Sequence, residues 1–139
     1  MRVEILSWAQ AEPAAAPIRF AIFMSEKDAA GVELDELDKD CAHAIAYDDA
    51  GKAIGTARMH PDGQIGRMAV MKEWRRRGVG AALLDGLVNE ARARGLAEVR
   101  LLAQVQALDF YRERGFVADG KIQAGGGGLQ QPMKKPLGA

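Results

Sequence analysis

The residues from Arg75 to Gly80 set three consecutive arginines beside two closely spaced glycines, just before an apolar segment. In the first turn of a helix the backbone N–H groups have no partner within the helix, and the aligned peptide dipoles place partial positive charge there. Gly78 and Gly80 leave those amides uncovered by side chains, and the arginines add cationic charge at the same place. This pattern predicts a binding site for an anion such as a pyrophosphate.

Other phosphate-binding loops fit this stretch poorly. A P-loop requires a lysine followed by serine or threonine, and no such pair occurs in the chain. A dinucleotide fingerprint requires a third glycine where Leu83 stands, and an acidic residue near the end of the next strand, where the chain has Ala103 and Gln104. A solvated turn is the simplest interpretation of an isolated glycine pair. This pair, however, lies between a predicted strand and a predicted amphipathic helix, where a ligand crevice is expected.

The elements on either side of the loop follow from hydrophobic periodicity. Residues 64–70 predict a strand, and the apolar residues that follow at helical spacing predict a helix that packs on the sheet and ends at Gly95. Residues 97–104 predict another strand, so this region is a strand, helix, strand crossover whose two strands run parallel. The apolar stripe of the helix consists of Val79, Leu83, Leu84, Leu87, Val88 and Ala91.

The remaining chain predicts a mixed α+β fold in a single domain of residues 1–139, with a central, mostly antiparallel sheet that contains one parallel strand pair and is flanked by helices. The run from Gly125 to Gly128 lacks packing side chains and predicts a mobile loop. Strands are expected at residues 1–8, 41–48, 53–60, 116–123 and 130–135, and further helices at residues 12–29 and 106–114.

Composition excludes several classes of function. The chain has 139 residues, 48% of them hydrophobic, which suits one compact core. Nineteen basic and nineteen acidic side chains cancel, so no broad positive field would recruit nucleic acid or anionic lipid. A lone Cys41 forms no internal disulfide, charged residues and a proline interrupt the first twenty residues, and no apolar run reaches the roughly 20 residues that span a bilayer. We therefore expect a cytoplasmic protein with no membrane role.

Two motifs resemble those of the GNAT N-acetyltransferase superfamily. The pattern Arg75-x-x-Gly78-x-Gly80 is similar to its acyl-CoA pyrophosphate loop. About thirty residues further on, residues 103–116 (AQVQALDFYRERGF) are similar to its closing pattern, in which a strand end leads to an Ala, a Phe-Tyr pair and a Gly-Phe. The resemblance is best over residues 42–120, and within the superfamily the chain resembles the small bacterial branch that contains ElaA and YjcF.

This resemblance implies an acetyl-CoA-dependent N-acetyltransferase with the GNAT acyl-CoA N-acyltransferase fold. The pantetheine arm is expected to pair with a strand edge, where the Val70 N–H meets the charge developing on the thioester oxygen. Tyr111 is expected to protonate the leaving thiolate, with a purely packed tyrosine as the alternative. The cofactor residues implied are Met68, Ala69, Val70, Arg75, Arg76, Arg77, Gly78, Val79, Gly80, Ala81 and Gln104. No metal is expected.

An acidic segment, residues 26–40, is a candidate for binding the acceptor amine. Residues 26–40 hold seven acidic residues against two lysines, which is a local anionic patch. The resemblance places this segment beside the acceptor, so Glu33, Asp35 and Glu36 are candidate substrate-binding residues, with a solvated acidic face as the alternative. The expected acceptor is then a cationic amine, or the N-terminus or a lysine of a peptide.

The other titratable residues do not identify a general base. His43 lies in an alternating strand and is expected to be packed or hydrogen-bonded, whereas His60 ends the next strand near a turn and is expected to be solvated. Cys41 is expected to be buried. The chain departs from its branch before the last strand, where Gly125 stands for an acidic residue and Gln130 for a histidine. That departure weakens the transfer of a specific substrate.

Two alternatives to catalysis remain open on the sequence. A noncatalytic acyl-CoA-binding or regulatory module would keep the anion loop without turnover. A nucleic-acid binder would use residues 72–77 with Trp74 and would bind in a salt-sensitive way, but it fits a neutral chain poorly. The oligomeric state stays open, with a homodimer as one option.

Overall fold

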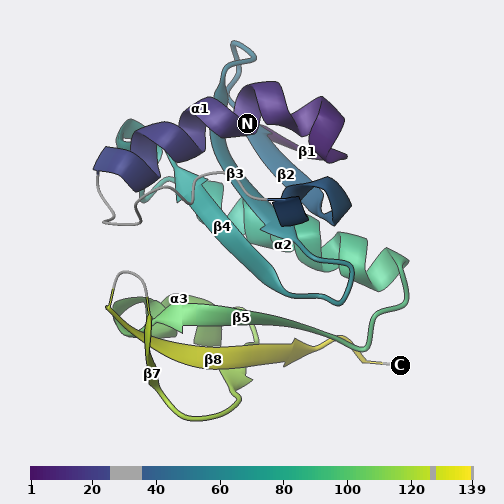
Figure 1. The fold of residues 1–139 in the computed structure, drawn as a ribbon, viewed down its shortest axis with the longest axis vertical. Helices are drawn as coiled ribbons and strands as arrows, with labels where there is room; N and C mark the ends of the chain where they lie inside the picture. The colour runs from purple at the N-terminus through teal and green to yellow at the C-terminus, as the bar shows by residue number, and fades with distance from the viewer. Residues whose placement is uncertain (26–35, 126–127, 139) are drawn as a thin grey trace.

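The computed structural model describes residues 1–25, 36–125 and 128–138. These residues form two β-sheets with helices on their faces (Figure 1). The strands are β1 (Arg2–Leu6), β2 (Ala42–Tyr47), β3 (Ala53–Met59), β4 (Ile65–Val70), β5 (Glu98–Gln104), β6 (Val117–Ala118), β7 (Gln123–Gly125) and β8 (Gly128–Pro136). The α-helices are α1 (Trp8–Ser25), α2 (Val79–Ala93) and α3 (Leu108–Arg112), and the 3-10 helices are η1 (Glu36–Asp40), η2 (Lys72–Trp74) and η3 (Val105–Ala107).

The first sheet is an antiparallel meander in the order β1-β2-β3-β4, which confirms the meander predicted from the sequence. Side-chain hydrogen bonds and a glycine stabilise the turn between β2 and β3. In the turn between β2 and β3 the Asp48 carboxylate accepts hydrogen bonds from the backbone N–H groups of Ala50 and Lys52, both at 2.9 Å. Gly51 follows with a φ of 85°, which only glycine adopts at low cost. The strands are thereby held in register.

The second sheet has the order β5-β8-β6, and β7 also pairs with β8. All of its pairs are antiparallel. The predicted parallel pair between β4 and β5 is confined to one bridge between Gln64 and Arg100, where the Arg100 N–H donates to the Gly63 carbonyl oxygen at 3.0 Å. Figure 1 shows the ribbons of β4 and β5 close together at this bridge and separating beyond it.

Helices α1 and α2 cover opposite faces of the first sheet (Figure 1). All six residues of the predicted apolar stripe on α2 are buried and belong to the main core. On the other face, Ile18 and Ile22 of α1 pack against Ala69 of β4. Among the described residues, no helix is both long enough and apolar enough to cross a bilayer.

Several boundaries differ from those expected, and the strand expected at residues 116–123 is confined to β6 (Val117–Ala118). Helix α1 starts at Trp8 rather than at residue 12, and it contains both Pro13 and Pro17, residues that would ordinarily argue against helix interior. Tertiary packing of the helix on β2 and β4 outweighs that local preference. The glycine run was expected to be a loop throughout, but Gly125 and Gly128 pair with each other as the end of β7 and the start of β8. Residues 126–127 lie outside the described residues.

Candidate active site

A β-bulge interrupts the pairing of β3 with β4. Thr56 pairs with Ala69, but the next pair joins Arg58 to Gly66, so that two residues of β4 oppose one residue of β3. Arg67 lies in the bulge with a φ of 51°, a left-handed conformation that is uncommon for a residue with a side chain. Such bulges re-aim neighbouring backbone groups and are frequent next to active sites.

The edge of β4 that faces β5 carries no partner strand among the described residues beyond the bridge at Gln64. We call this edge, from Ile65 to Val70, the open edge. Met71 directs its N–H to the Ile54 carbonyl oxygen of β3 at 2.9 Å, so Val70, the residue before it, directs its own backbone groups to the open edge. Met68 lies two residues earlier and shares that direction. The backbone groups proposed from the sequence for pantetheine pairing thus lie on one accessible edge.

The arginine-glycine loop, Arg75–Gly80, connects the open edge to α2. Gly78 is the N-cap of α2 with a φ of 83°, and a Cβ atom built there would meet no atom within 4 Å. Arg76 also has a positive φ, of 61°. All three arginines are exposed, and the Arg77 guanidinium lies 5.2 Å from the centre of the Trp74 ring. Uncovered helix amides and exposed cations therefore coincide, as the sequence predicts.

Three elements converge at Gly80. A Cβ atom on Gly80 would lie 3.6 Å from Met68 Sδ and 3.9 Å from Phe110 Cζ, which are ordinary contact distances. Gly80 lies in the first turn of α2, Met68 belongs to the open edge and Phe110 belongs to α3. The first turn of α2 is thereby packed between the strand edge and the helix that carries Tyr111.

Tyr111 is half-buried on α3, with its ring edge-to-face against two phenylalanines. The ring centroids are 5.0 Å from Phe110 and 5.8 Å from Phe116. Burial raises the pKa of the Tyr111 hydroxyl above its ordinary value of 10.0, so the phenol keeps its proton at neutral pH. This environment suits a proton donor whose ring is packed between two others, and it is equally the environment of a tyrosine with a purely structural role.

Gln104 ends β5 at the level of the open edge. The parallel bridge joins Gln64 of the first sheet to Arg100 of β5, and Met68 and Gln104 each follow their bridge residue by four positions. Because the bulge inserts one extra residue into β4, Gln104 lies level with the stretch from Met68 to Ala69. A pantetheine arm along the open edge would pass beside it. Gln104 pairs in register with Gln130 of β8.

The acidic segment is only partly exposed. Asp38 is fully buried and its carboxylate accepts hydrogen bonds from Arg19 and Arg58, both at 2.8 Å, so the prediction that it contributes to an anionic patch is wrong. Glu36 is exposed in η1. Glu33 and Asp35 lie outside the described residues.

The cluster around Asp38 was missed at the sequence level. His43 is buried beside it, and the His43 Nε2–H donates to the Asp38 carbonyl oxygen at 2.8 Å, which confirms that this histidine is packed and hydrogen-bonded. The Arg19 guanidinium also lies 5.1 Å from the centre of the Trp8 ring. The signal that could have found the cluster is Arg19 itself, a charged residue within the apolar spacing of α1.

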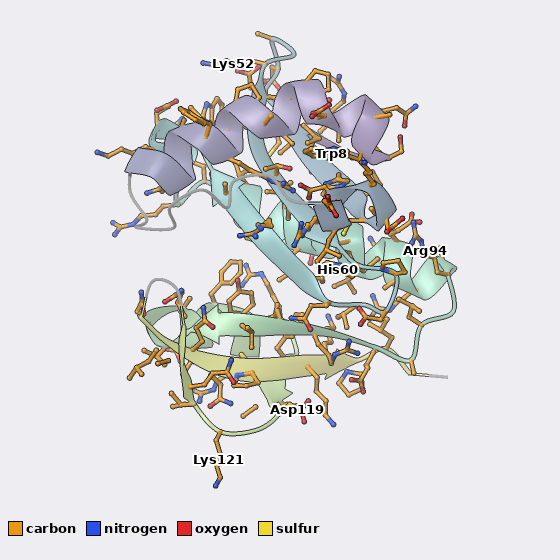
Figure 2. The ribbon with its side chains drawn as sticks, in the orientation of Figure 1. Trp8, Lys52, His60, Arg94, Asp119 and Lys121 are labelled. Carbon is orange, nitrogen blue, oxygen red and sulfur yellow. The ribbon has the colours of Figure 1, made fainter. Side chains whose placement is uncertain are left out.

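His60 differs from the expectation of a solvated side chain. It is half-buried, and its Nδ1 lies 3.4 Å from the Cys41 sulfur, which is buried as predicted (His60 is labelled in Figure 2). The Cys41 thiol also donates to the Leu37 carbonyl oxygen at 3.2 Å. Within residues 1–25, 36–125 and 128–138, no group of three or more His, Cys, Asp or Glu side chains could hold a metal ion.

Two separating sheets, an open strand edge and an arginine-glycine loop at a helix N-terminus together define an acyl-CoA N-acyltransferase fold. The family model described as the acetyltransferase (GNAT) domain matches residues 15–137, and the chain belongs to that family of N-acetyltransferases.

Its relatives include the N-acetyltransferase YjcF of Bacillus subtilis, itself described as uncharacterized, which is 32% identical over 103 residues and is matched over 71% of this chain and 73% of its own length. A crystal structure of an acyl-CoA N-acyltransferase from Pseudomonas aeruginosa superposes with a TM-score of 0.83, at 24% identity, over 97% of this chain and 99% of that chain. Escherichia coli ElaA superposes with a TM-score of 0.85, at 20% identity and the same coverage.

Proposed function

We propose that this enzyme moves an acetyl group from acetyl-CoA to a primary amine by direct attack of the amine on the thioester. The observation that carries the proposal is the continuity of the open edge of β4 with the uncovered first turn of α2. One surface thus offers strand-type hydrogen bonds to an extended amide-containing chain and a cationic helix terminus to the anion at its end. Acetyl-CoA has both features.

The residues of the chain suit this cosubstrate locally. The open space at Gly78 lets an anion approach the backbone, and Arg76 and Arg77 have no carboxylate partner among the described residues. Backbone groups of Met68 and Val70 would pair with the pantetheine arm. The Val70 N–H, fixed by the sheet, would donate to the thioester oxygen as negative charge develops there.

In the chemical step the amine nitrogen bonds to the carbonyl carbon, and collapse of the tetrahedral intermediate breaks the carbon–sulfur bond. Tyr111 would donate its proton to the departing thiolate, because burial keeps the phenol protonated at neutral pH. The proton lost by the amine passes to a separate acceptor such as solvent water. The acidic residues Glu33, Asp35 and Glu36 remain proposed contacts on the acceptor side, where they would attract the reacting ammonium group before it loses its proton.

A binding experiment tests the cosubstrate independently of turnover. A ligand at 100 times its dissociation constant raises the free energy of unfolding by about 2.7 kcal/mol, so acetyl-CoA should raise the melting temperature clearly. Acetyl-pantetheine, which lacks the pyrophosphate, should raise it much less because it cannot use the arginine-glycine loop. An absent shift with millimolar acetyl-CoA, or equal shifts with the two ligands, would contradict the proposed site.

A further inference from the structure

Three glutamines lie in a row on one face of the second sheet, and the two nearest the open edge are Gln104 and Gln130, with Gln123 of β7 opposite Gln130 on its outer side. Gln104 of β5 is paired in register with Gln130 of β8, and residues opposite each other in an antiparallel pair point to the same face. Their neighbours Ala103 and Gln131 are buried and point to the face on the α2 side. Gln104 and Gln130, here called the glutamine pair, therefore lie on the opposite face.

Glycines make the room that the glutamine pair occupies. A Cβ atom on Gly125 would lie 2.4 Å from Gln130 Oε1 and 2.6 Å from Gln130 Cδ. The Gln130 carboxamide therefore lies directly over the Gly125 backbone, and no other residue at position 125 would leave it there. Gly128 likewise lies beneath Gln104, with its Cβ position 3.8 Å from Gln104 Oε1. The positions of both carboxamides therefore depend on the absence of side chains at Gly125 and Gly128.

The glutamine pair lies level, along the strands, with the proposed reaction centre. Gln104 is level with Met68 and Ala69 of the open edge, and Gln130 is one strand further away, roughly 4.8 Å. The proposed pyrophosphate site is on the α2 side of the sheets, whereas the glutamine pair is on the other side. An acceptor that approaches the thioester from the face not used by the cosubstrate meets these carboxamides first.

The surroundings of the pair are apolar and then cationic. Leu102, which is 44% exposed, and Pro132 form the next pair along β5 and β8. Arg100 and Lys134 form the pair after that, and each is ion-paired, Arg100 with Asp62 at 3.1 Å and Lys134 with Asp119 at 3.8 Å. Figure 2 shows Asp119 toward the edge of the molecule away from α1. The glutamine pair itself offers no charge.

We propose that the glutamine pair recognises a carboxamide on the acceptor, so that the acceptor is an amino-acid amide or the N-terminus of a peptide. This inference rests on the proposed acetyl transfer. A carboxamide offers one donor and one acceptor group, which glutamine matches with its own carbonyl and NH₂ groups. A second ammonium group would find no carboxylate in the pair, and a free carboxylate would satisfy only the donors. The apolar pair beside it accommodates the aliphatic part of the acceptor.

The test compares three matched amines as acceptors: an amino-acid amide, the free amino acid and the corresponding diamine. The wild-type enzyme should have its highest kcat/KM for the amide. In Gln130→Glu, which keeps the shape and adds a charge, the preference for the amide over the diamine should fall by about tenfold or more, the effect of losing one hydrogen bond. Gln10→Glu is the matched control, because Gln10 is exposed on α1, which packs on the first sheet, and the preference should change by less than about twofold.

Gly125→Ala provides a second variant that leaves the fold intact, since its Cβ displaces only the flexible end of Gln130. It should lower the preference for the amide in the same way and leave the acetyl-CoA melting shift unchanged. Unchanged preferences in both Gln130→Glu and Gly125→Ala, with that shift retained, would overturn the assignment.

NMR of the glutamine side chains tests acceptor recognition without turnover, so it can fail independently of the proposed acetyl transfer. In the CoA complex, addition of the amide should shift the side-chain NH₂ resonances of Gln104 and Gln130 in the wild-type protein but not those of Gln10 on α1. If these resonances stay in place, the glutamine pair does not recognise the acceptor, even where thiol is released. If they shift while no thiol is released with any amine, the acceptor site stands and the proposed acetyl transfer fails.

Discussion

The guanidinium of Arg75 donates a hydrogen bond from Nε to the carbonyl oxygen of Val70, 3.2 Å away. This contact ties the first residue of the arginine-glycine loop to the last residue of the open edge. The two halves of the proposed acetyl-CoA site are therefore connected by one side chain. The neighbouring Arg77 instead lies against the Trp74 ring.

This difference predicts unequal effects of removing the two charges. Arg75→Gln should lower kcat/KM for acetyl-CoA by about tenfold more than Arg77→Gln, because a charge-assisted hydrogen bond to the strand is lost together with the charge. Both variants should retain the wild-type melting temperature without ligand. Steady-state kinetics at one fixed amine concentration measures the ratio, and equal losses in the two variants would mean that the Val70 contact has no role.

The first turn of α2 predicts a graded response to side-chain size. Gly80→Ala adds a methyl group at ordinary contact distance from Met68 and Phe110, so the melting shift with acetyl-CoA should persist. Gly80→Leu should abolish the shift, because the larger side chain must enter the space beside the helix amides. Gly78→Ala tests a different property, since its φ of 83° should cost roughly 1 kcal/mol of stability. Retained binding in Gly80→Leu would reduce the loop to a simple turn.

Tyr111→Phe separates packing from proton donation. The substitution removes one hydroxyl and little volume, so the ring contacts with Phe110 and Phe116 and the binding of acetyl-CoA should persist. Turnover should fall by roughly 10² to 10⁴, the range for a lost general acid. Because burial raises the pKa of the wild-type phenol above 10.0, its activity should not decline with phenol ionisation until the pH exceeds that value. Wild-type turnover in the variant would remove Tyr111 from the mechanism.

Asp38 predicts a large loss of stability that its exposed neighbour does not share. Asp38→Asn would leave Arg19 and Arg58 buried without their shared carboxylate, which should cost about 3–5 kcal/mol of the free energy of unfolding. Asp40→Asn makes the same chemical change at an exposed position and should stay within about 0.5 kcal/mol. Urea denaturation of the two variants decides between this account and a minor role for the cluster.

His43 predicts a loss of stability at acid pH. Burial lowers the pKa of His43 below its ordinary value of 6.5, although its hydrogen bond to Asp38 opposes the effect. Below pH 6.5 the unfolded chain therefore binds a proton that the folded chain does not, and the free energy of unfolding falls as the pH falls toward the folded-state pKa. A His43→Gln variant should lack this part of the pH dependence. Identical pH profiles for the two proteins would show that His43 is not responsible.

Features of the fold that depend on residues close together in the sequence could be predicted from the sequence. The apolar stripe of α2 requires only residues at helical spacing, and the loop before it requires only glycines at a helix start. Arg19 within an apolar spacing could indicate a buried charge, but its partners could not be predicted, because Asp38 and Arg58 lie far from it in the sequence. The bulge at Arg67 and the contact of Gly125 with Gln130 depend on strand register, which no single residue determines.

The most direct test of the account is the stoichiometry of transfer in a single reaction mixture. Incubation of the enzyme with acetyl-CoA and an amino-acid amide should release free thiol and form the N-acetylated amide in equal amounts, and omission of either the enzyme or the amine should abolish both products. A melting shift with acetyl-CoA, but no enzyme-dependent thiol release with amides, amino acids, diamines or peptides, would contradict acetyl transfer and indicate a noncatalytic acyl-CoA-binding protein.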